Sequence, residues 1–156
     1  MASKAQAKPF TPTQEKLFNA VTKPMSLLNT WLYRVSGGKI GGRWTHGEPI
    51  MLLTYTGRKT GQRYTKPLVY MRDGDTIVTV ASKAGVSKHP VWYLNLRANP
   101  DCEVELGREK RRMRARVANA EERQRYWPQL VKLNPDFETY KARTTREFPI
   151  LLLTPL

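Results

Sequence analysis

The chain has 156 residues, of which 27 are Lys or Arg and 13 are Asp or Glu, so its net charge is +14 with neutral histidines. This length fits one domain, and an apolar content of 40% excludes a disordered chain. The single cysteine excludes an internal disulfide and a cysteine-based zinc site, and we therefore expect a cytoplasmic protein. The short apolar runs exclude a membrane-spanning helix, and the excess of positive charge indicates an anionic partner.

The N-terminal part predicts an arm followed by a helix. Residues 1–12 are expected to be mobile, because Pro9 and Pro12 discourage a helix. A helical pattern begins at Thr13, and an interruption is expected at Pro24. Beyond it, apolar residues recur at three- and four-residue steps and predict one helical face, formed by Met25, Leu28, Trp31, Leu32 and Val35. We divide the chain into an arm, residues 1–24, and a main domain, residues 25–156.

The middle and the end of the chain predict mostly strands. After the Gly-rich link over 37–47, runs of apolar or alternating residues predict strands at 50–56, 63–71, 76–82, 102–106, 111–117 and 148–154. Helices are predicted at 91–98 and at 136–143. Between them, a capping box of Asn119 and Glu122 predicts the start of another helix, which runs to about Leu130 with a bend at Pro128. About six strands, mostly linked as hairpins, indicate a small antiparallel barrel with a few helices.

The turn from Gly57 to Arg63 carries three cations and two glycines between two apolar strands. Glycines let the backbone approach a ligand closely, and arginine side chains match phosphate oxygens, so this turn suits an anion. Its spacing is not that of a P-loop. From the residues alone, a solvated hairpin tip is an equally good interpretation.

A second candidate segment runs from Ala81 to Tyr93. A strand ends at Ser82, and a loop with Lys83 and Lys88 leads to a helix start, which favours a nearby anion. Trp92 and Tyr93 could cover a flat ring, although core packing is the favoured interpretation for at least one of them. Ser82 lacks the motif of a serine hydrolase. The basic stripe over 111–117 is interpreted as a solvated sheet face.

Three strings of the sequence closely resemble the deazaflavin-dependent nitroreductase family of actinobacteria, whose enzymes use coenzyme F420. They run from Leu52 to Asp75, from Val80 to Gly107 and from Phe148 to Pro155, and the likeness extends from about Leu28 to the C-terminus. The resemblance implies an α+β fold, a mostly antiparallel split β-barrel like that of pyridoxamine-phosphate-oxidase relatives, with a few surrounding helices. This agrees with the strands predicted from the residues.

The resemblance also implies a ligand for the basic loops, because the deazaflavin cofactor carries a phosphodiester and a tail of glutamates. The cations of the two candidate segments would bind this polyanion by charge-assisted pairs. The residues that the resemblance places at the cofactor are Leu53, Thr54, Arg58, Lys59, Thr60, Gly61, Gln62, Arg63, Pro67, Leu68, Val69, Tyr70, Val80, Ala81, Ser82, Lys83 and Trp92.

By the same resemblance, reduced F420 gives a hydride to a quinone, an enone or a nitroaromatic compound, and Ser82 or Tyr140 supplies a proton. The substrate would contact Val69, Trp92, Asn134, Phe137 and Tyr140. Some family members have tyrosines where this chain has Val69, Asn134 and Phe137, and this departure argues against the activation of nitro compounds.

Three alternatives stay open at this point. The charge of +14 also suits a basic nucleic-acid-binding barrel, although we expect no nucleic acid as partner, and a split barrel that binds FMN or heme is a further alternative. The N-terminal helix has an apolar face formed by Leu28, Trp31 and Leu32, with Phe18 upstream. This helix either caps the barrel mouth or lies on an anionic membrane surface, which it would contact through the lysines Lys4, Lys8, Lys16 and Lys23. The protein is expected to be a monomer or a dimer.

Overall fold

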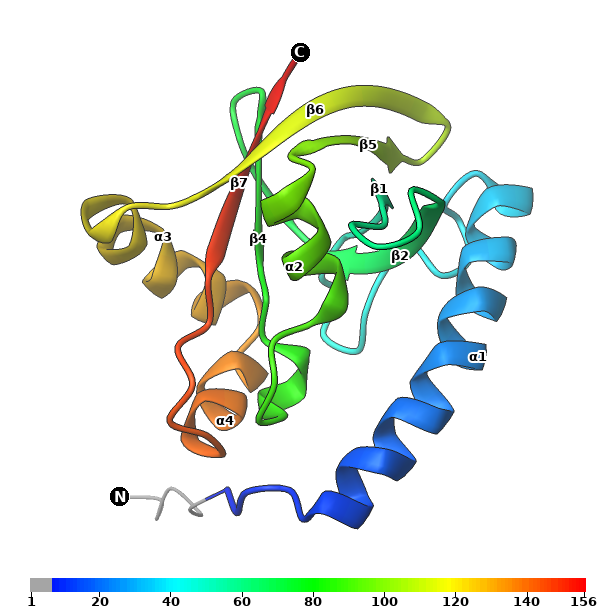
Figure 1. Cartoon of the computed structure of the whole chain (residues 1–156). Coiled ribbons are helices and arrows are strands. Elements are labelled where there is room, and N and C mark those ends of the chain that lie inside the picture. Colours follow the sequence, from blue (N-terminus) through cyan, green and yellow to red (C-terminus); the bar gives the residue numbers. More distant parts are fainter. Residues whose placement is uncertain (1–6) are drawn as a thin grey trace.

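An antiparallel sheet of seven strands forms the centre of the computed structural model, which describes residues 7–156. The strands are β1 (Ile50–Thr56), β2 (Arg63–Val69), β3 (Met71–Asp73), β4 (Thr76–Val80), β5 (Asp101–Leu106), β6 (Glu109–Val117) and β7 (Ile150–Pro155). Their order in the sheet is β2-β1-β5-β6-β7-β4-β3, and the sheet curls strongly (Figure 1). The predicted antiparallel, barrel-like sheet is therefore confirmed.

Within the described residues, five helical segments accompany the sheet: α1 (Pro12–Ser36), the short 3-10 helix η1 (Lys83–Gly85), α2 (Val91–Ala98), α3 (Ala120–Leu133) and α4 (Asp136–Ala142). The predicted capping box at Asn119 and Glu122 begins α3. Within residues 7–156, no helix is both long and apolar enough to cross a membrane.

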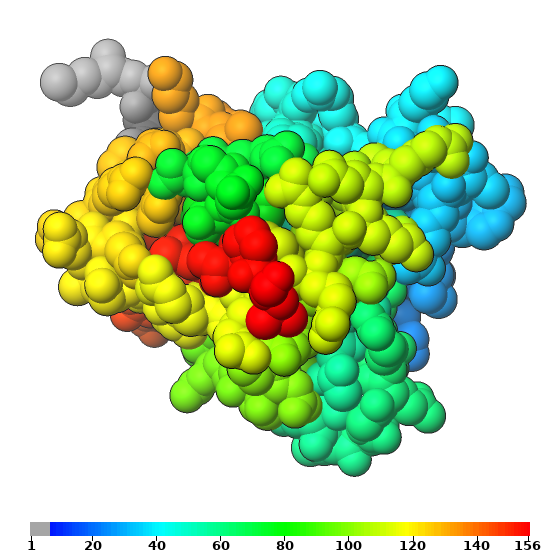
Figure 2. Space-filling view, turned by 90° about the horizontal axis from the view of Figure 1, so that it is seen from above, coloured from blue at the N-terminus to red at the C-terminus, as the bar shows by residue number. Residues whose placement is uncertain are grey.

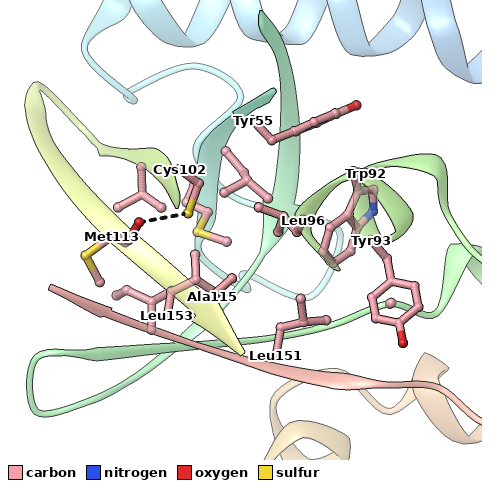
Figure 3. Close-up of a cluster of buried hydrophobic side chains, with 14 residues drawn as sticks. Tyr55, Trp92, Tyr93, Leu96, Cys102, Met113, Ala115, Leu151 and Leu153 are labelled. Atoms are coloured by element: carbon pink, nitrogen blue, oxygen red, sulfur yellow. Dashed lines mark hydrogen bonds between the residues drawn. The ribbon is translucent and has the colours of Figure 1, made fainter. Parts of the chain in front are cut away.

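The concave side of the sheet is filled by α2. Trp92, Tyr93 and Leu96 of this helix pack among side chains of β5, β6 and β7 (Figure 3). Cys102 lies in the same cluster, where its thiol donates to the carbonyl oxygen of Met113 at 3.6 Å. Burial raises the pKa of this thiol to about 12, which leaves it unreactive.

The other side of β4 and β7 is covered by α3 and α4. Alternate residues of a strand point to opposite faces. Accordingly, Ile77 and Leu151 belong to the α2 cluster, whereas Val78 and Leu152 pack against Tyr126 and the helices that follow β6. Both faces of these two strands are therefore buried. The C-terminal end of β7, in red, lies in the middle of the face seen from above (Figure 2).

Helix α1 lies along one side of the molecule, next to β2 (Figure 1). A capping box of Thr11 and Gln14 begins it, and Gly37 ends it with a left-handed backbone. The expected interruption at Pro24 is wrong, because the helix continues through this residue. Pro24 is exposed, so water can reach the backbone carbonyl that loses its donor.

Two further expectations differ from the structure. The strand expected at 63–71 is divided into β2 and β3 at Tyr70, whose N–H donates to the carbonyl oxygen of Pro49 at 3.2 Å. This gives seven strands where about six were predicted. Lys4 and the first six residues of the predicted mobile arm, 1–6, lie outside the described residues.

Candidate functional site

The basic turn between β1 and β2 is held by a buried asparagine of α2. Asn95 accepts one hydrogen bond from the backbone N–H of Arg58 at 3.0 Å and one from its guanidinium at 3.1 Å. Within the turn, the N–H of Gly57 donates to the carbonyl oxygen of Gln62 at 2.7 Å. The core of the protein thus fixes the position of this turn.

The other side chains of the turn point into solvent. Lys59, Thr60 and Gln62 are exposed, and Arg63 lies 3.9 Å from the carboxylate of Glu103, at the outer limit of an ion pair. Such a pair contributes little in water. The turn therefore presents its cations to whatever binds at this end of β1 and β2.

Two lysines of the candidate site are half-buried: Lys66 on β2, shortly after the turn, and Lys83 at the start of η1. Burial, and then the charge of Lys83, lower the pKa of Lys66, and burial also lowers the pKa of Lys83. Neither ammonium group forms an ion pair with any residue between 7 and 156. The charge of Glu15 offsets that of Lys83 in part, and the positive charge that remains on the two lysines attracts an anion.

The backbone after β4 turns sharply through left-handed conformations. Lys83, Ala84 and Gly85 have φ values of 44°, 51° and 79°. A left-handed backbone is unfavourable for the two residues that carry a Cβ, and such strain concentrates at functional sites. Gly85 packs on α4, where a Cβ would collide with the carbonyl oxygen of Tyr140. This contact brings the loop that follows Ser82 against the helix that carries Tyr140.

The side chain of Arg146 holds the loop that follows Ser82 in place. Its guanidinium donates to the carbonyl oxygens of Ala81, Ser82 and Val86 at 3.0, 2.6 and 3.1 Å and lies over the ring of Phe148. Burial lowers the pKa of Arg146. The guanidinium thus gives the carbonyl oxygens of Ala81 and Val86 a donor, and it is a second donor to that of Ser82, which also accepts from the N–H of Gly85 at 3.0 Å.

An apolar wall stands next to this loop. Val69, Val80, Phe137 and Tyr140 belong to one cluster, in which Phe137 and Tyr140 pack edge to face with ring centroids 6.3 Å apart. Burial, followed by the charge of Asp136, raises the pKa of the Tyr140 hydroxyl, and Arg143 opposes this shift. Asn134 is buried where α3 gives way to α4, and its Oδ1 accepts from the N–H of Asp136 at 3.0 Å.

Other predicted site residues lie elsewhere. Leu53, Ala81 and Trp92 belong to the α2 cluster, with Leu68 packed against it, so the interpretation of Trp92 and Tyr93 as core residues holds for both. Thr54 shares a hydrogen bond with Thr65 at 2.8 Å, and Pro67 is half-buried in the pair of β1 and β2.

Tyr70 lines a cavity that none of the other residues predicted at the cofactor lines. An open cavity of about 420 Å³ lies at the other end of β1 and is lined by Tyr33, Gly38, Lys39, Gly41, Gly42, Arg43, Pro49, Ile50, Tyr70 and Gly107. Of the residues predicted at the cofactor, Tyr70 alone is among those that line it.

Sequence reasoning missed Asn95, Lys66 and Arg146. Asn95 could have been noticed, because it is the polar residue on the buried face of an otherwise apolar helix. Lys66 and Arg146 carry no such signal, since their burial depends on segments distant in the sequence. In residues 7–156, no group of three His, Cys, Asp or Glu side chains could hold a metal ion. The arrangement therefore suits an anionic ligand that also has a flat apolar part.

Comparisons with known proteins agree with this arrangement. Residues 26–155 match the model of a family described as F420H(2)-dependent quinone reductase. An F420H(2)-dependent quinone reductase of Mycobacterium tuberculosis is 38% identical over 130 residues, which are 81% of this chain and 87% of that protein.

Two solved structures share both the fold and part of the sequence. An F420-H2 dependent reductase, FDR-A, is 36% identical with a TM-score of 0.63, over 67% of this chain and 93% of its own. A domain-swapped dimer is 31% identical with a TM-score of 0.65, over 83% of this chain and 98% of its own. The similarity to FDR-A confirms the predicted split-barrel class.

Proposed function

The chain belongs to the F420H(2)-dependent quinone reductase family, and on this basis we propose that it transfers a hydride from reduced coenzyme F420 to a quinone. It is therefore an oxidoreductase. Membership of this family favours that function over a nucleic-acid-binding barrel and over a barrel for FMN or heme.

The observation that carries the proposal is a group of cations that form no ion pair within residues 7–156. Lys66 and Lys83 are half-buried neighbours, and burial lowers the pKa of each. Arg58 and Lys59 extend this positive region to the tip of the β1–β2 turn. A phosphodiester and a chain of carboxylates would pair with these ammonium groups and raise the pKa of both lysines again, so the residues present fit the polyanionic cofactor.

When bound, the deazaflavin supplies the hydride. The chain's own residues bind, orient and exclude water. We assign the tail to Arg58, Lys59, Arg63 and Lys83, together with Lys66. Val69, Phe137 and Val80 form an apolar wall against which a flat acceptor can stack.

The proton that accompanies the hydride comes from Ser82 or Tyr140 in this proposal. Burial raises the pKa of the Tyr140 hydroxyl, so this group is protonated at neutral pH and has a proton to donate. Ser82 is nearly buried, and its carbonyl oxygen is held by Arg146 at 2.6 Å, which fixes the serine beside the loop.

The test is a titration of the full chain with oxidised F420, followed by its cofactor fluorescence, together with the oxidation of reduced F420 by 2-methyl-1,4-naphthoquinone. We expect micromolar or tighter binding that weakens with salt, and quinone-dependent turnover. Arg58→Ala or Lys59→Ala weakens binding, and Tyr140→Phe lowers turnover with little effect on cofactor affinity. A chain that ignores F420, or binds it without salt dependence, contradicts the proposal.

We further propose that α1 places the enzyme on an anionic membrane surface, where lipid-soluble quinones reside. The polar side of α1 faces the protein: Thr30 and Tyr33 are buried, and Arg34 pairs with Glu105 at 2.8 Å. Its apolar side is exposed, with Leu17, Val21, Met25, Leu27, Leu28, Trp31 and Val35 at the surface. The exposed lysines Lys8, Lys16 and Lys23 would meet the lipid headgroups.

A further inference from the structure

The open cavity of about 420 Å³ at the start of β1 is lined by positive but not by negative side chains. Lys39 and Arg43 are among its lining residues, which in the described part of the chain include no Asp or Glu. Neither cation forms an ion pair with any residue between 7 and 156. The Nη1 group of Arg43 donates to the carbonyl oxygen of Gly47 at 2.8 Å, which holds the guanidinium in place. A cavity with such a surplus of positive charge attracts an anion.

The loop that carries these two cations also supplies backbone donors. The N–H groups of Gly41, Gly42 and Arg43 follow one another in the chain, and none of them donates to an acceptor in residues 7–156. All three residues line the cavity. Gly41 has a left-handed φ of 75°, and a Cβ on Gly42 would collide with the carbonyl oxygen of Gly38, so this loop requires glycines. Successive N–H groups in a turn of this kind form an anion-binding concavity.

Two tyrosines that line the cavity add a fixed wall and a further donor. The hydroxyl of Tyr33 is fully used, because it donates to the carbonyl oxygen of Glu105 at 3.1 Å and accepts from the N–H of Gly107 at 2.7 Å. The hydroxyl of the half-buried Tyr70 has no hydrogen-bond partner among the described residues. The cavity thus offers ammonium, guanidinium, backbone and phenol donors. A phosphate group, which has more oxygens than a carboxylate, suits this set best.

Exposed apolar side chains stand beside both cations in the sequence. Ile40 follows Lys39, Trp44 follows Arg43, and both are exposed. Val35, near the end of α1, is also exposed and belongs to the apolar side of that helix. Tryptophan next to basic residues is typical of protein surfaces at the level of lipid headgroups. A lipid therefore fits these surroundings better than a phosphate compound without an apolar part.

We propose that this cavity binds the phosphate group of an anionic membrane lipid. Lys39, Arg43 and the N–H groups of Gly41 and Gly42 contact the phosphate oxygens, and the acyl chains lie over Ile40 and Trp44. The site is at the other end of β1 from the turn assigned to the F420 tail, so it is a second anion site that takes no part in hydride transfer. The lipid as the source of the phosphate rests on the proposed membrane surface of α1.

The test follows the backbone amide signals of the ¹⁵N-labelled full chain, without F420, as sodium phosphate is added at constant ionic strength. We expect the signals of Gly41 and Gly42 to shift and to saturate, whereas sodium chloride leaves them in place. Lys39→Ala and Arg43→Ala should each weaken this response about tenfold, the effect of losing a hydrogen bond from a charged group. The matched control is Lys110→Ala, which removes the same charge from an exposed position on β6 and should leave the response unchanged.

A second titration identifies the source of the phosphate. Dihexanoylphosphatidylglycerol, added as a monomer, should shift the same two signals at a lower concentration than inorganic phosphate, and replacing Ile40 and Trp44 by serine should remove that advantage. Equal affinities would overturn the lipid as the ligand and leave a water-soluble phosphate compound. Signals of Gly41 and Gly42 that do not respond to phosphate, or that respond equally in Arg43→Ala, overturn the site itself. Binding at the F420 turn is read separately from Gly61, so a failure of the proposed cofactor site does not affect this result.

Discussion

Asn95 joins the β1–β2 turn to the core by accepting two hydrogen bonds from Arg58, at 3.0 Å from the backbone N–H and at 3.1 Å from the guanidinium. Its helix, α2, is fixed in the concave side of the sheet by Trp92, Tyr93 and Leu96. The most exposed cations of the candidate site thus depend on a residue that is itself buried. An arginine held in this way loses less conformational freedom when it binds an anion.

Asn95→Ala should weaken F420 binding about fivefold or more, because the turn loses the two bonds that orient it. The free energy of unfolding should fall by about 1–2 kcal/mol. Fluorescence titration and urea unfolding measure the two effects. Asn119→Ala is the matched control: it removes the cap of α3, costs about 1 kcal/mol of stability and should leave F420 affinity unchanged. Equal affinity losses in both variants would refute a specific role for Asn95.

Gly85→Ala should destabilise the protein and displace the loop after Ser82. Gly85 has a φ of 79°, and a Cβ would meet the carbonyl oxygen of Tyr140, so backbone strain adds to a steric clash. We expect a loss of about 1–3 kcal/mol, measured by thermal or urea unfolding, and a lower turnover.

The control for this clash is Gly61→Ala in the β1–β2 turn. Gly61 has a similar φ of 68°, but apart from its two chain neighbours no described residue lies within 4 Å of the position that its Cβ would take. It therefore measures the cost of the left-handed backbone alone. If the two variants lose the same stability, the contact between η1 and α4 does not constrain the loop.

The sheet could be predicted because each strand carries a local signal. The run from Ile50 to Thr56 is apolar enough for a strand buried on both faces, and six of the seven residues of β1 are indeed buried. Local signals do not predict a feature of the fold that depends on contacts with other parts of the protein. The proline rule predicts a break at Pro24, yet good caps at both ends and an exposed position let α1 continue.

The candidate site was predictable only in part, for a related reason. Glycines and cations in one turn are visible in the sequence, and so is a serine at a strand end. The role of Arg146 is not, because it depends on a segment far along the chain: its guanidinium donates to the carbonyl oxygens of Ala81, Ser82 and Val86, 60 to 65 residues earlier. A charged residue in a polar segment gives no sign that packing will enclose it.

The stability of the chain should rise with pH in the alkaline range because of Lys66. Burial and Lys83 lower the pKa of Lys66 below 10.5, its value in an unfolded chain. Between these two pKa values the folded state binds fewer protons than the unfolded state, so stability increases as pH rises through that window. Lys66→Met should remove this part of the increase and raise stability at pH 7, as urea unfolding at several pH values would show.

F420 binding should have the opposite pH dependence. The polyanion needs charged lysines, so its affinity should fall as pH rises through the lowered pKa values of Lys66 and Lys83. Lys66→Met should weaken binding at pH 7 and make the remaining alkaline loss smaller. An affinity that is constant up to pH 10.5 would mean that neither half-buried lysine contacts the cofactor.

Replacing Leu28 and Trp31 together by serine should reduce membrane binding without affecting the fold, because both side chains are about 60% exposed on α1. We expect the wild type to sediment with vesicles that contain phosphatidylglycerol, less with pure phosphatidylcholine, and the variant to lose most of this binding. The control replaces Val91 and Val117, two exposed valines on other elements, by serine. If the wild type instead elutes as a dimer that the Leu28 and Trp31 changes dissociate, the apolar side of α1 contacts a second copy of the chain, and the membrane proposal is wrong.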